Sequence, residues 1–232
     1  MKLLFTVERY GEEVAGGSEA ACRQVAEKLA ARGHHVEVVT SRAKSYVDWA
    51  DHFPAGTTEI NGVQVHRPGV RGPRRPEQFG PIHGRILQTR RAPLFVQRDW
   101  LRLQGPDIPE LLPWLHANTP RFDLANFFTY LYPTTAFGLP VAAQHRPTVL
   151  FPTAHEEPMM ELRVFDELVR AADGLLYLTP EGRALYERYI PMLQAREAAM
   201  LACLDPGERA QLGKLLDKLA THVPEWGSAS DL

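Results

Sequence analysis

The chain has 232 residues and a formal net charge of −2 at pH 7, so it can hold one large domain and a helical appendage. A charge so close to zero argues against nucleic acid as a partner, because binding to phosphate backbones needs a surplus of Lys and Arg. Cys22 and Cys203 form no disulfide or metal-binding pattern, which is typical of a reducing compartment. The sequence shows no apolar run of membrane-spanning length. We therefore expect a cytoplasmic protein.

The first 40 residues predict a strand, a turn, a helix and a second strand. The runs LLFTV (residues 3–7) and VEVVT (residues 36–40) are typical of buried strands. Apolar residues recur at helical spacing between them, and Gly33 stands where the helix should end. This arrangement predicts the opening βαβ unit of a doubly wound sheet.

A glycine pair precedes the predicted helix. Gly16 and Gly17 allow a sharp turn and a close approach of a ligand to the backbone. Ser18 is the predicted N-cap. The free N–H groups of the helix N-terminus predict a phosphate or sugar site at this turn.

The rest of the chain continues the alternation. Asn61-Gly62 lies between two short β-prone runs and predicts a β-hairpin over residues 58–66, and residues 68–81 are rich in Pro, Gly and Arg and predict a loop. Further strands are predicted at residues 122–128, 148–151 and 174–178. Helices are predicted at residues 82–103 (broken near Pro93), 108–118, 134–143 (bent or ended at Pro140), 160–172 and 181–189. Such alternation favours a mainly parallel sheet with ligands at the carboxyl ends of its strands.

The loop after the strand at 148–151 carries His155, Glu156 and Glu157. It lies at the edge where open α/β sheets bind ligands. These side chains suit hydrogen bonding to hydroxyl groups, and a solvated polar loop is the alternative of equal weight.

Thr129 and Tyr130 follow the strand at 122–128, at the same edge. Aromatic rings with hydroxyls suit sugar faces, so both residues are candidates for a cleft, with core packing as the alternative. Core packing is the preferred interpretation for Phe127 and Phe128.

The opening unit resembles the N-terminal domain of retaining glycosyltransferases of the GT-B type, family 4. The matching segments are GGSE at residues 16–19, LAARGHHV at 29–36 and INGVQVHR at 60–67. The resemblance covers residues 1–190. It implies a single Rossmann-like, doubly wound domain on the acceptor side of an enzyme that transfers a hexose from a nucleotide-sugar with retention of configuration.

The resemblance also implies site residues. His155 takes the catalytic position, near the transferred sugar. The implied substrate-binding residues are Gly16, Gly17, Ser18, Glu19, Thr129, Tyr130, Glu156 and Glu157. No metal and no cofactor are implied, because the nucleotide-sugar is a substrate, and the expected partner is a sugar or glycoconjugate acceptor.

One departure from the family concerns the second domain. GT-B enzymes bind the donor mainly on a second Rossmann-like domain, and no second βαβαβ series follows residue 190. A transferase must hold donor and acceptor in one geometry. We therefore expect little or no activity from this chain alone, unless a partner chain supplies a donor domain.

Residues 191–222 predict an amphipathic helical segment, and residues 223–232 a flexible tail. Asp205, Pro206 and Glu208 predict a helix start, with cap, first position and third position filled as usual. Residues 196–222 resemble the C-terminal dimerisation helices of MarR-type regulators, without their DNA-binding part. The apolar stripe either packs in cis or forms a homodimer through residues 193–220. The alternatives to a half-enzyme are a non-catalytic binding or regulatory module and a truncated or fused gene product.

A cluster of arginines marks the middle of the chain. It suits an anionic lipid head group, and so a membrane surface, or a phosphorylated acceptor, and solvated loop and helix faces are the commoner explanation. Its members are Arg71, Arg74, Arg75, Arg85, Arg90, Arg91, Arg98 and Arg102, with Trp100 among them.

Overall fold

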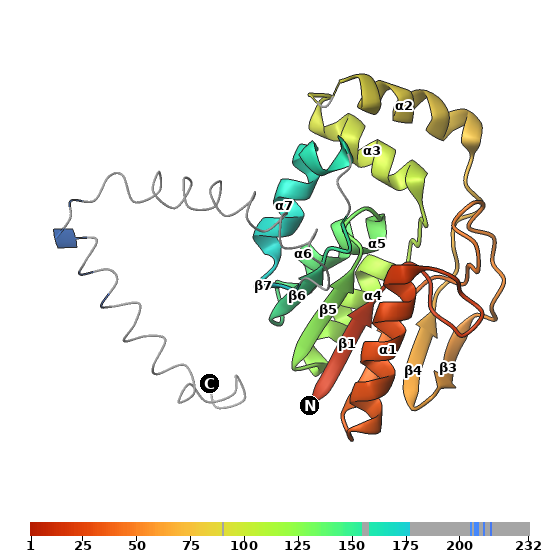
Figure 1. Cartoon of the computed structure of the whole chain (residues 1–232), viewed down its shortest axis with the longest axis vertical. Helices are drawn as coiled ribbons and strands as arrows, with labels where there is room; N and C mark the ends of the chain where they lie inside the picture. The colour runs from red at the N-terminus through yellow and green to blue at the C-terminus, as the bar shows by residue number, and fades with distance from the viewer. Residues whose placement is uncertain are drawn as a thin grey trace. The chain divides into compact units, whose positions relative to one another are not determined.

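The computed structural model describes residues 1–89, 91–154 and 158–176, together with residues 205, 207, 208, 211 and 214. The chain divides into two compact units, Met1–Arg183 and Ala184–Leu232. The first unit is a Rossmann-like α/β domain built on a 7-stranded sheet (Figure 1). In the described part of the chain, no helix is long and apolar enough to cross a membrane.

The sheet is mainly parallel, as predicted, and its strands lie in the order β3-β4-β2-β1-β5-β6-β7. β3 pairs antiparallel with β4, and the other neighbours pair in parallel. β1 and β2 are buried at every position but the first, which explains their near-continuous apolar sequences. The strands are β1 (Lys2–Thr6), β2 (His35–Val39), β3 (Gly56–Ile60), β4 (Val63–Arg67), β5 (Leu124–Phe128), β6 (Thr148–Phe151) and β7 (Gly174–Leu175).

The predicted hairpin is confirmed. Ile60 of β3 pairs with Val63 of β4, and Asn61 and Gly62 between them have φ angles of 48° and 78°. Positive φ at both central positions is the mark of the tight hairpin turn in which Asn-Gly is preferred.

Helix α1 (Gly17–Ala31) packs on one face of the sheet (Figure 1). Cys22 and Ala26 are fully buried there against the apolar strands. The helix ends as predicted at Gly33, whose φ is 86°. The N–H groups of Gly33 and His34 donate to the carbonyls of Ala30 (2.9 Å) and Leu29 (3.2 Å), which satisfies two carbonyls of the last turn.

A buried carboxylate ties β2 to its surroundings. Glu37 is 1% exposed, and its two oxygens accept hydrogen bonds from Arg121 at 2.7 Å and 2.6 Å. His35 and His66 lie 2.7 Å and 2.5 Å from the same oxygens. Burial by itself raises the pKa of Glu37, but the hydrogen bonds from His66, His35 and Arg121 outweigh it and lower that pKa to about 2.

Two helices lie beyond the carboxyl ends of the strands, α2 (Pro76–Gln88) and α3 (Leu94–Gln104) (Figure 1). The predicted break at Pro93 is confirmed, since this residue is the N-cap of α3. The predicted loop over residues 68–81 is wrong at its end, because α2 begins at Pro76. A proline at the first helical position is favourable, and Phe79 stacks on His83 one turn later, with ring centroids 4.9 Å apart.

The helices around β5 begin and end differently from the prediction. Helix α4 (Leu111–Asn118) starts three residues later than predicted and continues into the 3-10 turn η1 (Thr119–Arg121). The helix predicted over residues 134–143 is two short helices, α5 (Pro133–Ala136) and α6 (Gly138–Ala142). The break falls at Phe137, not at Pro140, because Pro140 lies in the first turn of α6, where its missing N–H leaves no hydrogen bond unmade.

The helix predicted over residues 160–172 is confirmed as the 3-10 turn η2 (Pro158–Glu161) followed by α7 (Arg163–Ala171). Its start is docked on α3, where the fully buried Gln97 accepts a hydrogen bond from the Val164 N–H at 3.0 Å. The last two residues of the strand predicted at 174–178, and the helix predicted at 181–189, lie outside the described residues.

The helix start predicted at Asp205 is confirmed. Asp205 Oδ1 accepts hydrogen bonds from the N–H groups of Gly207 (2.6 Å) and Glu208 (2.9 Å), and Glu208 Oε2 accepts one from the Asp205 N–H (2.9 Å). These reciprocal bonds form a capping box. The rest of the helical segment predicted at 191–222, the tail at 223–232 and the boundary at residue 190 lie outside the described residues.

Candidate functional site

The sheet has a topological switch point between β1 and β5. The chain leaves β1 through α1 to reach β2 on one side, and β5 pairs with β1 on the other. The loops after β1 and β5 therefore diverge, and open α/β sheets bind ligands in the crevice at such a point. The loop after β6 follows at the same edge, and together the three loops form the candidate site.

The turn that begins α1 differs from the prediction in one respect. Gly16 is the N-cap residue, and no side chain caps the helix. The predicted capping by Ser18 is wrong because the helix starts one residue before it. The Ser18 hydroxyl instead donates to Glu19 Oε2 at 2.7 Å.

Three ionisable side chains are buried beneath this turn. Glu8, Arg9 and Glu19 are 1%, 5% and 4% exposed. The Arg9 guanidinium pairs with Glu19 Oε1 and donates to the carbonyls of Lys44 (3.0 Å) and Ala15 (3.2 Å). Burial raises the pKa of Glu8, and the neighbouring Glu19 carboxylate raises it further. Both effects favour the neutral form of Glu8.

The Glu19 carboxylate determines what the glycine turn can accommodate. A side chain at Gly16 would overlap this carboxylate, whereas Gly17 is exposed and has no neighbour within 4 Å of an added Cβ. The sequence leaves phosphate and sugar open as ligands of this turn. The Glu19 carboxylate in the first turn of α1 already interacts with the positive end of the helix dipole, so this turn attracts a second anion less than a free helix N-terminus does, which favours a ligand with hydroxyl groups.

Two threonines end neighbouring strands in a strained conformation. Thr129 follows β5 with a φ of 64°, and Thr153 lies two residues after β6 with a φ of 46°. Their hydroxyls are hydrogen-bonded at 3.0 Å. Left-handed backbone is rare for β-branched residues, and such strain clusters at binding and catalytic sites. Thr129 is 8% exposed and Thr153 is half-buried, so Thr153 is the more accessible of the pair.

The tyrosines of the loop after β5 have separate roles. Tyr130 is 5% exposed and its ring packs edge-on against Phe165 of α7, 4.7 Å between centroids, so its aromatic face is used in packing. Tyr132 is half-buried, and its ring lies edge-on to Trp49 at 5.5 Å. The Tyr132 ring therefore connects the loop after β5 to the segment that follows β2. Burial raises the pKa of Tyr132.

The remaining predicted site residues, His155, Glu156 and Glu157, lie outside the described residues. The sequence reasoning missed Glu8, Tyr132 and Thr153. Glu8 carried a usable signal, because an acidic residue directly after a buried strand marks the carboxyl edge of the sheet. The strain at Thr153 has no signal in the sequence, since threonine is not a residue that favours positive φ.

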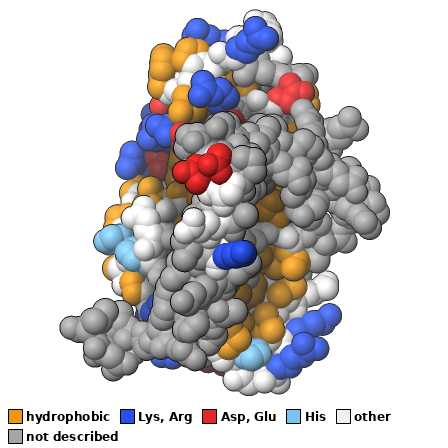
Figure 2. All heavy atoms as spheres, turned by 90° about the vertical axis from the view of Figure 1, so that its left-hand side faces the viewer, with side chains coloured by type: hydrophobic (Ala, Val, Ile, Leu, Met, Phe, Trp, Pro, Cys, Tyr) orange, Lys and Arg blue, Asp and Glu red, His pale blue; other side chains and the backbone are white. Residues whose placement is uncertain are grey.

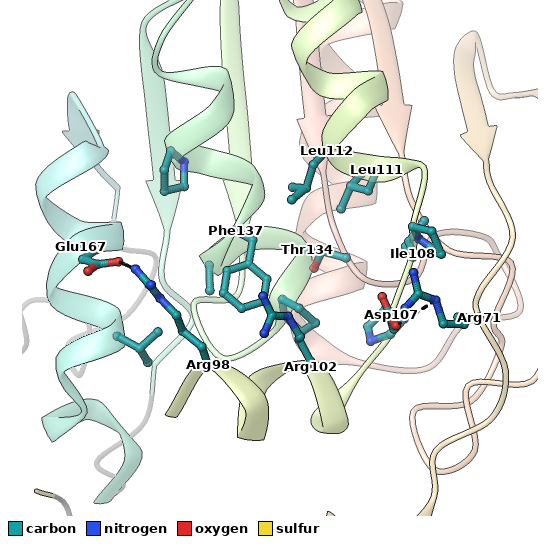
Figure 3. A pocket seen from close by; sticks show the side chains of 16 residues that line it. Arg71, Arg98, Arg102, Asp107, Ile108, Leu111, Leu112, Thr134, Phe137 and Glu167 are labelled. Carbon is teal, nitrogen blue, oxygen red and sulfur yellow. Dashed lines mark hydrogen bonds and ion pairs between the residues drawn. The ribbon is translucent and has the colours of Figure 1, made fainter. Parts of the chain in front are cut away.

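The structure gathers part of the arginine cluster. Arg71, Arg98 and Arg102 line a pocket of about 500 Å³ between α3, α4, α5 and α7 (Figure 3). Arg74 and Arg75 line a smaller one of about 170 Å³ together with Arg71 and Arg102. Arg85 and Arg91 line neither pocket, and Arg90 lies outside the described residues. Figure 2 shows basic and hydrophobic side chains intermixed at the end of the domain that carries α2 and α3.

No protein-family model, no curated protein and no solved structure matches the chain. Among the described residues, no group of three or more His, Cys, Asp or Glu side chains is placed to hold a metal ion. Fold and site together define a Rossmann-like α/β domain with a polar, hydroxyl-rich switch point.

Proposed function

We propose that the first unit is the acceptor-side domain of a GT-B, family-4 type glycosyltransferase, and that its switch point binds a sugar or glycoconjugate acceptor. One observation carries the proposal. Hydroxyl and carboxyl groups from three separate loops lie at the carboxyl edge of the sheet, where the hydrogen bond between Thr129 and Thr153 joins the loops after β5 and β6.

The chemistry of the accessible groups supports a ligand rich in hydroxyls. Ser18, Tyr132 and Thr153 are half-buried, and each carries a hydroxyl that both donates and accepts hydrogen bonds. The Glu19 carboxylate beneath them is buried and paired with Arg9, and it accepts the hydrogen bond of the Ser18 hydroxyl. In this proposal His155, two residues after Thr153, bonds a sugar hydroxyl or orients the acceptor, and Glu156 and Glu157 accept hydrogen bonds from the same ligand.

The proposed parent reaction moves a hexose from a nucleotide-sugar to the acceptor with retention of configuration. Such a transfer needs the donor held against the acceptor in one geometry, which supplies much of the rate enhancement. The Glu19 carboxylate already interacts with the N-terminus of α1, so the glycine turn attracts the donor's diphosphate less than a free helix N-terminus does. We therefore expect this chain by itself to bind an acceptor and to transfer no hexose at a measurable rate.

Titration calorimetry with UDP, GDP and a panel of their sugar conjugates tests whether the chain lacks a donor site. We expect no saturable binding of any nucleotide by protein that is folded by circular dichroism. Micromolar binding of one nucleotide-sugar, or turnover of it by the pure chain, would contradict the proposal.

Light scattering on the same sample addresses the alternative of a binding module that self-associates through residues 193–220. A dimer mass together with sugar binding and no turnover would favour the module. A monomer mass would leave the acceptor-side domain as the better account.

A further inference from the structure

The pocket lined by Arg71, Arg98 and Arg102, here called the arginine pocket, lies on other elements than the switch point. Two of its arginines come from α3 and the third from the loop before α2 (Figure 3). Figure 3 shows the three in a row, with apolar side chains on the other side of the pocket. The apolar residues of the lining include Ile108, Leu111, Leu112, Phe137 and Val164.

The arginines outnumber the acids around them. The arginine pocket and the smaller pocket beside it share Arg71, Arg102 and Asp107. Together the two linings contain five arginines (Arg71, Arg74, Arg75, Arg98 and Arg102) and two carboxylates (Asp107 and Glu167). A concave surface lined by one sign of charge attracts ligands of the opposite sign.

The ion pairs present are of a kind that a ligand can replace. Arg98 pairs with Glu167 at 2.8 Å, and Arg71 with Asp107 at 3.5 Å. All four side chains are at least 40% exposed, and exposed pairs add little to stability. A phosphate group offers arginine several oxygens and is bound in a bidentate manner, so it competes well with a single carboxylate oxygen.

Arg102 is the arginine best placed for a ligand. Its acidic neighbour is Asp99, one turn earlier on the same helix at 3.1 Å, which is not part of the pocket lining. Its guanidinium lies 5.6 Å from the centre of the Phe137 ring, within the range of a cation–π contact. This contact holds the charge at the junction of the basic and apolar sides.

We propose that the arginine pocket binds the phosphate monoester of a molecule with an apolar or ring-shaped body. The phosphate meets Arg102, Arg98 and Arg71, and the body rests on Phe137 and Leu112. The volume of about 500 Å³ lies within the usual range of small-molecule sites. The inference does not depend on the proposed glycosyltransferase function, since it uses different residues and a different ligand chemistry.

Titration of the full chain with phenyl phosphate, with phenol as the uncharged control, tests the proposal. We expect saturable binding of phenyl phosphate that weakens with added salt, and no binding of phenol. Arg102→Gln should weaken binding about tenfold or more, as loss of a charge-assisted pair does. Arg32→Gln, which removes an exposed arginine at the end of α1, is the matched control and should bind as the parent does.

A second variant is expected to bind more tightly, and such a gain cannot result from misfolding. Glu167→Gln frees Arg98 and removes a negative charge from the lining, so we expect it to bind phenyl phosphate several-fold more tightly. Equal binding by the parent, Arg102→Gln and Glu167→Gln would overturn the proposal.

Vesicles distinguish a lipid source of the phosphate from a soluble one. Sedimentation with phosphatidylcholine vesicles containing phosphatidic acid, lost in Arg102→Gln, would assign the pocket to a lipid head group. Binding of phenyl phosphate without such sedimentation would assign it to a soluble ester. Absence of both, or vesicle binding that Arg102→Gln leaves unchanged, would overturn the proposal.

Discussion

The hydroxyl oxygens of Thr129 and Thr153 lie 3.0 Å apart, and both residues have left-handed backbone, with φ angles of 64° and 46°. Each residue lies just beyond the carboxyl end of its strand, so the two neighbouring strands β5 and β6 are both followed by a strained β-branched residue. The N–H groups of Thr129 and Tyr130 donate to the carbonyls of Phe151 (2.9 Å) and Pro152 (3.2 Å). These bonds hold the two chain segments together and keep the strained conformation in place.

Replacing the accessible threonine with glycine should relieve the strain. Thr153→Gly removes the Cβ that disfavours positive φ, so we expect an unchanged or higher free energy of unfolding despite the lost hydroxyl bond. Thr57→Gly is the control, because the same substitution in regular β3 should cost about 1 kcal/mol. Chemical denaturation measures both. A Thr153→Gly variant as destabilised as Thr57→Gly would show that the backbone at 153 is not strained.

The raised pKa of Glu8 predicts an unusual pH dependence. Its pKa is raised in the folded chain, so its contribution to stability is complete below the ordinary glutamate pKa and is lost as the pH rises towards the folded-state value. Glu8→Gln keeps the shape and removes the titration, so it should flatten this loss. The measurement is the melting temperature of both proteins from pH 5 to pH 8, and parallel curves would contradict the raised pKa.

Gly16 and Gly17 should respond differently to alanine. Gly16→Ala forces the Glu19 carboxylate away from Arg9, and separating a buried ion pair is destabilising by about 3 kcal/mol or more. Gly17→Ala adds a methyl group in open space within a helix and should be neutral or mildly stabilising.

A double-mutant cycle supplies the control for this prediction. In a Glu19→Ala background the added methyl at Gly16 meets no carboxylate, so its further effect on the free energy of unfolding should be small. Additive effects of the two substitutions would mean that Gly16 is required for another reason.

Glu37 should govern stability in acid. Its pKa of about 2 is below that of an unfolded glutamate, so its contribution is present above pH 4.5 and is lost as the pH falls towards 2. The difference corresponds to about 3 kcal/mol at neutral pH. Glu37→Gln should remove it and reduce the slope of stability against pH between 4.5 and 2. Glu59→Gln, at an exposed position of β3, should leave the acid unfolding curve unchanged.

Much of the fold can be predicted from the sequence because its signals are local. Asn61-Gly62 selects the hairpin turn, Gly33 ends α1 through a left-handed residue, and Asp205 with Glu208 forms a capping box. The errors fall at prolines. Pro76, Pro81 and Pro140 are breakers by local rules, yet each lies in a helix, because the first turn accepts proline and tertiary packing overrides propensity elsewhere.

The candidate site is harder to predict, because it is defined by tertiary contacts between residues from different segments of the chain. Glu19 was expected to contact substrate, but its carboxylate is buried and paired with Arg9, which lies ten residues earlier. Nothing in the spacing of the arginines distinguishes those of the arginine pocket from Arg85 and Arg91. The assignment requires the approach of α3 to α4, α5 and α7, which only the folded chain brings about.

Saturation-transfer NMR tests the central claim most directly, because the binding of candidate acceptors and donors is measured in the same sample. The folded full chain is mixed with a panel of monosaccharides and disaccharides together with UDP-glucose and GDP-mannose. We predict saturation of the ring protons of at least one free sugar, reduced in Ser18→Ala, and none of the uracil or guanine protons. Saturation of the nucleobase protons, or of no sugar at all, would contradict an acceptor site at the switch point.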